Sequence, residues 1–568
     1  MVDIDTNGTQ KNLSKAFFTL WLLALIILSV FIRVHGVEAF YYSADEMMHV
    51  EMAQGRNASE VWQFSLSAAH PPLGNFLRHY WIGFSDAPWF VRSESLVFGI
   101  GLIVLYYIIG NKLGGQMGGL CCATLIAFSN GCIIQSYIAR NYIFLLFFLS
   151  LGFYCYLIWR TRRSIPALLG YGLVGCLAAL THFSAIFCIF CIAAYEALSL
   201  VRQKKLRLFM QWAVVNLFIA CVAFAIYYVW RPSMAPLEPY FAIFKSPPFA
   251  YQLLHVLLFP LIASGYILPG YAFAVLLILC QIAVLHSPPS FVRNNDRLRM
   301  CLALNGFAYA VGMLLIATYL YPEAGPRHNI WVLPLVIPAA GLMLAGACTW
   351  LAEKYIRSVP VIAILLLIAG CLTYDATARF RDDEYNMPLK QWQALNVYLD
   401  RLTSSDLIVT EKDDGVMFSG LYRISGTDST SAKEMARLVP YRNGGVVFNP
   451  YFPRYYSREM LLATLREAQA HHMLDGIRNL VFLRLAWSRS PLTDLMLCRE
   501  LDKTIVTFPP LATGAPITRN GIYDSVAALM IIRKESLLND VLPTAGKAHH
   551  CLDGKHDMVP GFDAAVSF

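Results

Sequence analysis

The sequence carries little charge for its length of 568 residues. Only 14% of the residues are Asp, Glu, Lys or Arg and 57% are hydrophobic, and the mean hydropathy is +0.51. A soluble globular domain has about 25% charged residues, so most of this chain is expected to lie in lipid. Residues 1–375 hold 23 Lys and Arg against 15 Asp and Glu, whereas residues 376–568 hold 22 of each. Because no segment has a basic soluble surface, we expect no nucleic-acid partner.

The sequence also lacks several short signals. None of its CxxC or Cys/His spacings suggests a zinc site, and it has no internal repeat and no low-complexity segment. All of its 14 cysteines except Cys498 and Cys551 lie in apolar runs, where a thiol behaves as a small hydrophobic group. No small-residue cleavage site follows the first apolar run, which begins near Ala16, so we interpret this run as a retained helix.

Long apolar runs predict about eleven transmembrane helices, since each is near the roughly 20 residues that cross a bilayer. They lie at 16–33, 90–110, 114–133, 139–159, 165–181, 183–200, 208–230, 251–285, 300–320, 329–352 and 358–374. The run at 251–285 is too long for one straight helix and contains prolines and glycines, so part of it is expected to be kinked or re-entrant. With a cytoplasmic N-terminus, 15 of the 23 basic residues of residues 1–375 fall in loops on the cytoplasmic side.

The same alternation of sides places the loop 34–89 and residues 376–568 outside. In residues 376–568, strand-like segments at 406–410, 478–485, 503–508 and 526–534 alternate with helical segments near 388–402, 457–471 and 490–500. This alternation predicts a soluble α/β domain of ordinary size. The expected fold class is therefore a polytopic α-helical membrane protein with a C-terminal soluble α/β domain.

The first outer loop, 34–89, is rich in groups that can do chemistry. If 41–54 is an interfacial helix, Asp45 and His49 share one face and Glu46 lies about 100° away. One carboxylate would then act as a general base and the other would hold a sugar or a cation. The alternative is the solvated polar face of an amphipathic helix that lies on the bilayer. Further along the loop, His70 begins a rigid His-Pro-Pro turn, which is either a substrate contact or a plain re-entry turn.

Other candidate residues lie at the predicted outer ends of the membrane spans. Arg140 lies at the predicted outer end of the span 139–159, where its side chain either neutralises a lipid phosphate or extends to the lipid headgroups. His182 lies in a tight turn and serves either as a ligand or as a neutral histidine bonded to backbone. Arg327 and His328 follow Pro326 at a predicted helix N-terminus, which favours an anion site.

Six segments within residues 16–350 follow one another in a familiar order: SADEMMHVEMA, AAHPPLGNFLRHYW, APWFVRSESLVFGIGLIVLYYI, QSYIARNYIFLLFF, ALTHFSAIF and PRHNIWVLPLVIP. In this order they resemble the GT-C type of polyprenyl-phosphate-dependent membrane glycosyltransferase, the group of the protein O-mannosyltransferases and the lipid A aminoarabinose transferases (glycosyltransferase family 39-like). The resemblance implies that 1–375 form a transmembrane catalytic domain. In that domain Asp45 matches the catalytic acidic residue, with Glu46 beside it, and Arg140 and Tyr142 match an Arg-x-Tyr element. Ile138 stands where many such proteins have an acidic residue.

The function implied is an inverting glycosyl transfer from a polyprenyl-phosphate sugar to a glycolipid, polysaccharide or protein of the cell envelope. The site and the domain 376–568 would face outward from the bacterial cytoplasmic (inner) membrane. Cations beside the lipid phosphate make an obligatory metal unnecessary, although Glu46 and His49 are candidate ligands for a divalent cation. The alternatives are a multi-span transporter, which should carry its charges at mid-bilayer in repeated halves, and a membrane-anchored envelope assembly or sensor protein.

Overall fold

The computed structural model describes the following parts of the chain: residues 6–39, 44–53, 57–67, 70–85, 87–234, 296–317, 330–354, 403, 405–410, 436–440, 446–450, 469–470, 472, 474–485, 503–508 and 527–533. The chain forms two compact units. The first consists of residues 1–37, 53–382 and 565–568, and the second of residues 38–52 and 383–564. The second unit thus includes a short stretch of the first outer loop. The predicted domain boundary between 375 and 376 lies outside the described residues.

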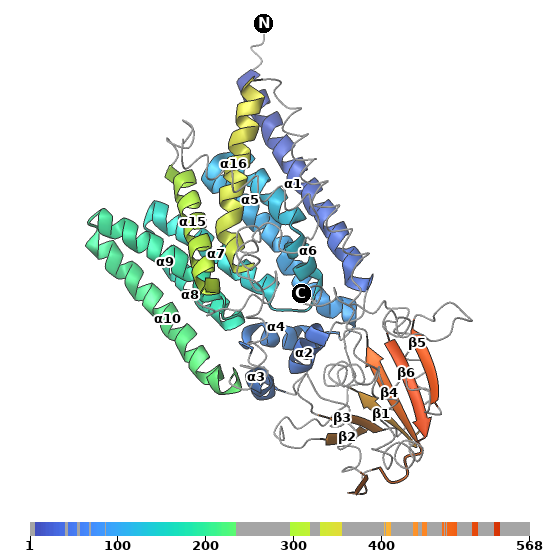
Figure 1. Cartoon of the computed structure of the whole chain (residues 1–568). Coiled ribbons are helices and arrows are strands. Elements are labelled where there is room, and N and C mark those ends of the chain that lie inside the picture. Colours follow the sequence, from blue (N-terminus) through green and yellow to red (C-terminus); the bar gives the residue numbers. More distant parts are fainter. Residues whose placement is uncertain are drawn as a thin grey trace. The chain divides into compact units, whose positions relative to one another are not determined.

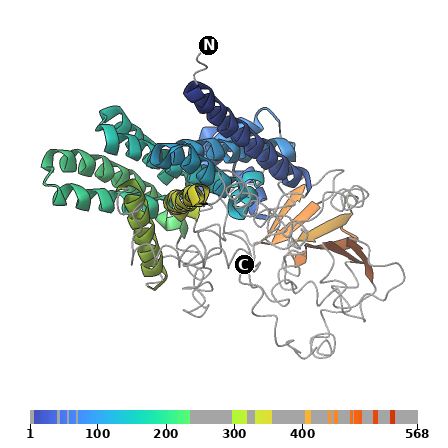
Figure 2. The ribbon, with the colours of Figure 1, turned by 90° about the horizontal axis from the view of Figure 1, so that it is seen from above.

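The first unit is helical (Figure 1). Its helices are α1 (Thr6–Ala39), α3 (Ala58–Ser67), α4 (Leu73–Ile82), α5 (Pro88–Phe128), α6 (Asn130–Tyr137), α7 (Tyr142–Arg162), α8 (Ile165–Thr181), α9 (Ala185–Arg202), α10 (Leu206–Met234), α15 (Asp296–Ala317) and α16 (Leu333–Lys354). α16 packs on α5 and α7, and Figure 2 shows it almost along its axis. α7 packs on α8, while α10 packs on both α8 and α9.

The chain is a polytopic membrane protein. Four described helices, α5, α7, α9 and α10, are long and apolar enough to cross a membrane, and α1, α8 and α16 contain shorter apolar stretches. Large apolar side chains of α10 stay exposed, which suits contact with lipid tails: Leu206, Met210, Val214, Leu217, Phe218, Phe224 and Tyr228. Nine of the eleven predicted spans fall on described helices. The other two, 251–285 and 358–374, lie outside the described residues.

α5 is a pair of antiparallel helical arms joined by a glycine turn. Gly114 and Gly115 have non-helical backbone angles, and Gly115 has a φ of 70°, which side chains disfavour. A Cβ at Gly110 would lie 2.3 Å from the carbonyl oxygen of Gly118, so the two arms touch backbone to backbone. The predicted spans 90–110 and 114–133 correspond to these arms. The second arm ends at Phe128, because Ser129 is extended and begins a separate short helix, α6.

Two buried arginines join the C-terminal end of α1 to the two ends of α5. Arg33 of α1 donates hydrogen bonds to the carbonyl of Ala127 (2.9 Å) and the hydroxyl of Ser136 (3.1 Å). Arg92 of α5 donates to the carbonyl of Val37 in the last turn of α1 (2.8 Å). The last four carbonyls of a helix have no partner within the helix. Each arginine therefore supplies donors to a neighbouring helix end.

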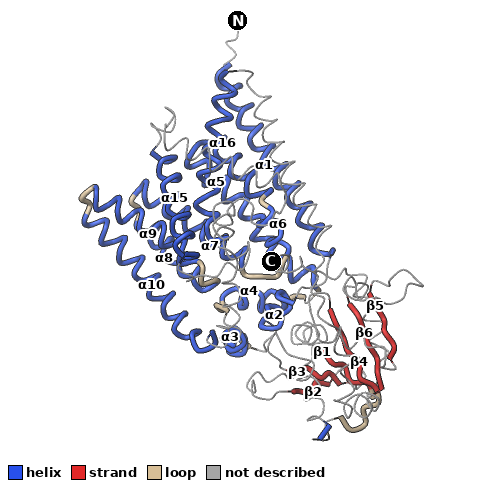
Figure 3. Tube along the Cα trace, in the orientation of Figure 1, coloured by secondary structure: helices blue, strands red, loops and turns tan. Residues whose placement is uncertain are grey.

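The second unit contains one mixed six-stranded sheet (Figure 3). The strands are β1 (Asp406–Thr410), β2 (Ala436–Pro440), β3 (Val446–Pro450), β4 (Asn479–Leu485), β5 (Lys503–Phe508) and β6 (Ala527–Arg533), in the order β2-β3-β1-β4-β6-β5. β1 is parallel to β3 and β4, and the other pairs are antiparallel. The four predicted strands are confirmed as β1, β4, β5 and β6. The predicted helices near 388–402 and 490–500, and most of the one at 457–471, lie outside the described residues.

Candidate functional site

The His-Pro-Pro turn leads directly into α4 and is fixed by Ser65 at the end of α3. The carbonyl of Ser65 accepts hydrogen bonds from the backbone N–H of His70 (3.1 Å) and from the indole N–H of Trp230 on α10 (3.2 Å). The hydroxyl of Ser65 accepts a bond from the amide of Asn75 on α4 (2.9 Å). Because these contacts join α3, α4 and α10, they fix the position of the His70 backbone.

Arg140 lies in the tight connection between α6 and α7. Its backbone N–H donates to the carbonyl of Ile138 (2.8 Å), and its side chain is buried. The guanidinium carbon lies 5.1 Å from the centre of the Tyr142 ring, a cation–π distance. The two residues of the predicted Arg-x-Tyr element are thus in contact at the N-terminus of α7.

His182 occupies the turn between α8 and α9. Its Nδ1 lies 3.2 Å from the backbone N–H of Ser184, which donates to it, and 2.8 Å from the Ser184 hydroxyl. An Nδ1 that accepts from a backbone N–H leaves the proton of a neutral imidazole on Nε2. Burial, followed by the charges of His70 and Arg140, lowers the pKa of His182 to about 3. His182 is therefore neutral near pH 7 and offers a single N–H donor.

These four predicted residues come together where three helices begin. The charges of His70 and Arg140 act on His182, and the rings of His182 and Tyr142 are 5.1 Å apart. α4, α7 and α9 start beside this group, and none of their N-cap side chains makes a capping hydrogen bond. Helix N-termini carry partial positive charge and free N–H groups. An arginine, N–H donors and helix N-termini in one place can bind an anion such as a phosphate.

Three acidic residues of the first outer loop, Asp45, Glu46 and Glu51, lie on a short helix, α2 (Ala44–Ala53), within the segment 41–54 that was considered as a helix. Glu46 and His49, one turn apart, are each only 2% exposed, so they do not form the solvated face of a helix on the bilayer surface. Asp45 lies in the first turn of α2, but its side chain is outside the described part of the structure. Residues 38–52 belong to the second unit. The roles proposed for Asp45, Glu46 and His49 stay predictions.

Arg327 and His328 lie outside the described residues, so their predicted anion site is also untested. Among the residues that the structure does describe, no group of three or more His, Cys, Asp or Glu side chains is arranged to hold a metal ion. The suggested cation ligands Glu46 and His49 therefore have no described third ligand of these types. Metal dependence stays a prediction.

Sequence reasoning missed a buried ion pair beside the site. Arg78 of α4 and Glu94 of α5 lie 2.5 Å apart between Nε and Oε1, and both side chains are almost fully buried. The guanidinium carbon of Arg78 is 5.9 Å from the ring centre of Phe144 on α7. This pair connects α4 to α5 and α7 within the first two turns of each helix. The signal in the sequence was one charge of the pair in each of two short polar stretches, FLRHYW and VRSESL, that begin with apolar residues.

Asn141 was also missed. Its side chain is buried, at 3% exposure, and neither Nδ2 nor Oδ1 makes a hydrogen bond to any described residue. It stands between Arg140 and Tyr142 at the N-cap of α7. A buried amide without partners is unusual, because such a group loses its bonds to water. Its position next to Arg140 was the signal available in the sequence.

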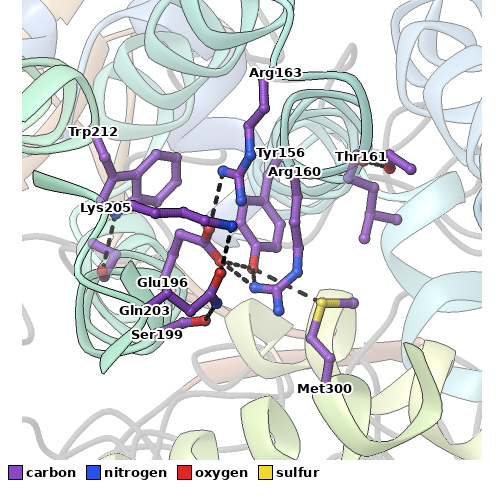
Figure 4. Close-up of polar contacts among 12 residues, drawn as sticks. Tyr156, Arg160, Thr161, Arg163, Glu196, Ser199, Gln203, Lys205, Trp212 and Met300 are labelled. Atoms are coloured by element: carbon purple, nitrogen blue, oxygen red, sulfur yellow. Dashed lines mark hydrogen bonds and ion pairs between the residues drawn. The ribbon is translucent and has the colours of Figure 1, made fainter. Parts of the chain in front are cut away.

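A second polar cluster, drawn in Figure 4, joins α7, α9 and α15 at the other end of α7. The buried carboxylate of Glu196 is paired with Arg160 and, at 3.3 Å, with Arg163. The hydroxyl of Tyr156 donates to Glu196 (3.0 Å) and accepts from Arg160 (2.9 Å). The Tyr156 hydroxyl also lies 3.8 Å from the sulfur of Met300. Because the charged groups satisfy one another, this cluster pins three helices together and offers little to a ligand.

Comparison with known proteins identifies the fold. No protein-family model matches the sequence, and no curated protein is similar to it in sequence. The structure is similar to that of ArnT from Cupriavidus metallidurans in the apo state, with a TM-score of 0.55 and 11% identity over 90% of this chain and 98% of ArnT. It is equally similar to ArnT bound to undecaprenyl phosphate, with a TM-score of 0.54, 10% identity and the same coverage. The chain thus has the GT-C-type fold that the sequence resemblance predicted.

Proposed function

We propose that this protein is a glycosyltransferase that moves a sugar from a polyprenyl-phosphate donor to a cell-envelope acceptor. The observation that carries the proposal is the group of Arg140, His182, Tyr142 and His70 at the N-termini of α4, α7 and α9. Such a group suits the phosphate of a lipid-linked sugar. ArnT, whose fold this chain shares, has been crystallised with undecaprenyl phosphate, which supports the choice of donor.

In the proposed reaction, the oxygen of an acceptor attacks the anomeric carbon while the bond from that carbon to the phosphate oxygen breaks. The electron pair of the breaking bond stays with the lipid phosphate, whose charge grows. Arg140, the N–H of His182 and the helix N-termini stabilise this charge. Asp45 takes the proton of an acceptor hydroxyl as general base, with Glu46 beside it. Attack from the face opposite the phosphate inverts the anomeric configuration.

The acceptor class includes glycolipids, polysaccharides and proteins of the envelope. We place the reaction on the outer face of the bacterial cytoplasmic (inner) membrane, because the basic loops fall on the other side of the spans. Glu46 and His49 are the residues that we would test first for binding of a divalent cation. No metal takes part in the step described.

The test separates donor binding from turnover in the purified full-length protein. Arg140→Gln should weaken binding of undecaprenyl phosphate by at least about 10-fold, because a charge-assisted contact to phosphate is lost. Asp45→Asn should bind this lipid normally but transfer sugar about 10² to 10⁴ times more slowly, because the proton acceptor is gone. Transfer is measured from a panel of undecaprenyl-phosphate sugars, with an envelope extract as acceptor.

Arg202→Gln, which removes an exposed arginine at the end of α9, is the matched control and should change neither quantity. Wild-type protein that binds no undecaprenyl phosphate would contradict the proposed function. Normal turnover in Asp45→Asn would remove Asp45 as the base, and loss in Glu46→Gln alone would assign that role to Glu46.

A further inference from the structure

The side chain of Asn141 has a donor and an acceptor that no described residue satisfies. It is buried beside two residues of the anion site, Arg140 and Tyr142, and contributes no capping bond to α7. A carboxamide of this kind needs both a hydrogen-bond acceptor, for Nδ2, and a donor, for Oδ1. One group that both donates and accepts would satisfy the whole amide.

The first turn of α4 is shaped around this amide. A Cβ built on Gly74 would lie 2.2 Å from Oδ1 of Asn141 and 2.8 Å from Nδ2. Only a residue without a side chain leaves the amide in its present place. The carboxamide is thus held at the meeting point of the N-termini of α4 and α7, the same two helices that begin at the anion site.

We propose that Asn141 binds a hydroxyl group of the donor sugar and helps to select that sugar. This inference rests on the proposed function. A phosphate diester has acceptor oxygens alone, so it can satisfy Nδ2 but not Oδ1. A sugar hydroxyl supplies a donor and an acceptor together. The α-carbons of Arg140 and Asn141 are about 3.8 Å apart, as for any neighbouring residues. If Arg140 holds the phosphate, Asn141 is therefore close enough to reach the sugar that the phosphate carries.

The experiment compares two lipids on the same variants of the full-length protein. One is undecaprenyl phosphate without a sugar, and the other is undecaprenyl phosphate carrying glucose, mannose, galactose or aminoarabinose, each tested separately. Asn141→Leu has a similar size but no hydrogen-bonding groups. We expect it to bind the sugar-free lipid within about 2-fold of wild type. It should bind the preferred sugar-bearing lipid about 5- to 10-fold more weakly, as for the loss of a neutral hydrogen bond.

A second variant keeps the amide but moves it. Gly74→Ala forces the side chain of Asn141 to shift, so it should also reduce binding of the sugar-bearing lipid and spare the sugar-free one. Gly152→Ala in α7 is the control, because its Cβ would meet nothing closer than 3.9 Å. Binding of the sugar-free lipid also reports whether each variant is folded.

Two results would overturn the inference while the proposed function stands. In the first, Asn141→Leu weakens both lipids equally, which would assign Asn141 to the phosphate or to packing. In the second, it weakens neither. Wild-type protein that binds neither lipid would instead overturn the proposed function and the inference together.

Discussion

At the scale of single residues, His182 links the electrostatics of the site to stability. The pKa of His182 is lowered to about 3 in the folded protein by burial and by the charges of His70 and Arg140, whereas a free histidine has a pKa near 6.5. Between these two values the unfolded state binds a proton that the folded state does not. Stability therefore falls as the pH drops below about 6.5, and above that pH this residue adds no further dependence.

His182→Gln removes this group, so it should flatten the pH dependence of stability. We expect the melting temperature of the wild-type protein to fall more between pH 7.5 and pH 5 than that of the variant, when both are measured in the same detergent. The melting temperatures of the variant and the wild type at pH 7.5 do not have to agree, because the variant also loses the contacts of His182 with Ser184 and Tyr142. An equal fall in both proteins would show that His182 gains a proton in the folded state.

The sequence located Arg140 and His182 at the outer ends of apolar runs and His70 in its His-Pro-Pro turn, and the family resemblance added Tyr142. It did not show that they meet, since that depends on how α4, α7 and α9 pack. Asn141 escaped notice for a physical reason. An asparagine before a helix is an ordinary capping residue, and only the structure shows that this one makes no cap and has no hydrogen-bond partner among the described residues.

At the scale of elements, the hairpin of α5 depends on glycine for two different reasons. A Cβ at Gly118 would lie 2.7 Å from the carbonyl oxygen of Gly110, so Gly118→Ala should push the two arms apart. A Cβ at Gly115 would meet nothing within 4 Å, but its φ of 70° suits glycine. We expect Gly118→Ala to cost about 1–3 kcal/mol and Gly115→Ala about 1 kcal/mol.

Gly306→Ala is the matched control, because Gly306 lies inside α15 with open space around its Cα. Alanine favours a helix more than glycine does, so this variant should be neutral or slightly stabilised. Thermal unfolding of the purified variants in one detergent measures all three changes. The hairpin packing would be wrong if Gly118→Ala unfolded at the same temperature as Gly306→Ala.

Of the six described strands, the sequence pattern predicted four and missed two. β1 and β4 were found because they are continuous apolar runs, and their side chains Leu407, Leu480 and Phe482 are buried. β2 and β3 were missed. Each has five residues and ends in proline, and ARLVP contains only three apolar residues before its proline. These two strands exist because β3 pairs with β1 and offers its other edge to β2, which is a tertiary effect.

At the scale of the whole molecule, buried arginines and exposed basic residues lie on different predicted sides of the membrane. Arg33, Arg78, Arg92 and Arg140 lie in or beside predicted outer loops, and all four are buried. Arg202, Lys204, Lys205 and Arg207, assigned to the cytoplasmic side, are exposed at the turn between α9 and α10. A count of Lys and Arg along the sequence does not distinguish buried from exposed side chains. The exposed set is the one that bears on orientation in the membrane.

This difference leads to a prediction about topology. An odd number of spans, with the exposed basic turns inside, puts residues 34–89 and 376–568 on the outer face together. In a variant without reactive native cysteines, Ser429→Cys should react with a membrane-impermeant maleimide in intact cells. Lys204→Cys, at the exposed α9–α10 turn, should react only after lysis. If Ser429→Cys also required lysis, the number of spans would be even or the orientation reversed, and reactivity of Lys204→Cys in intact cells would identify the reversed orientation.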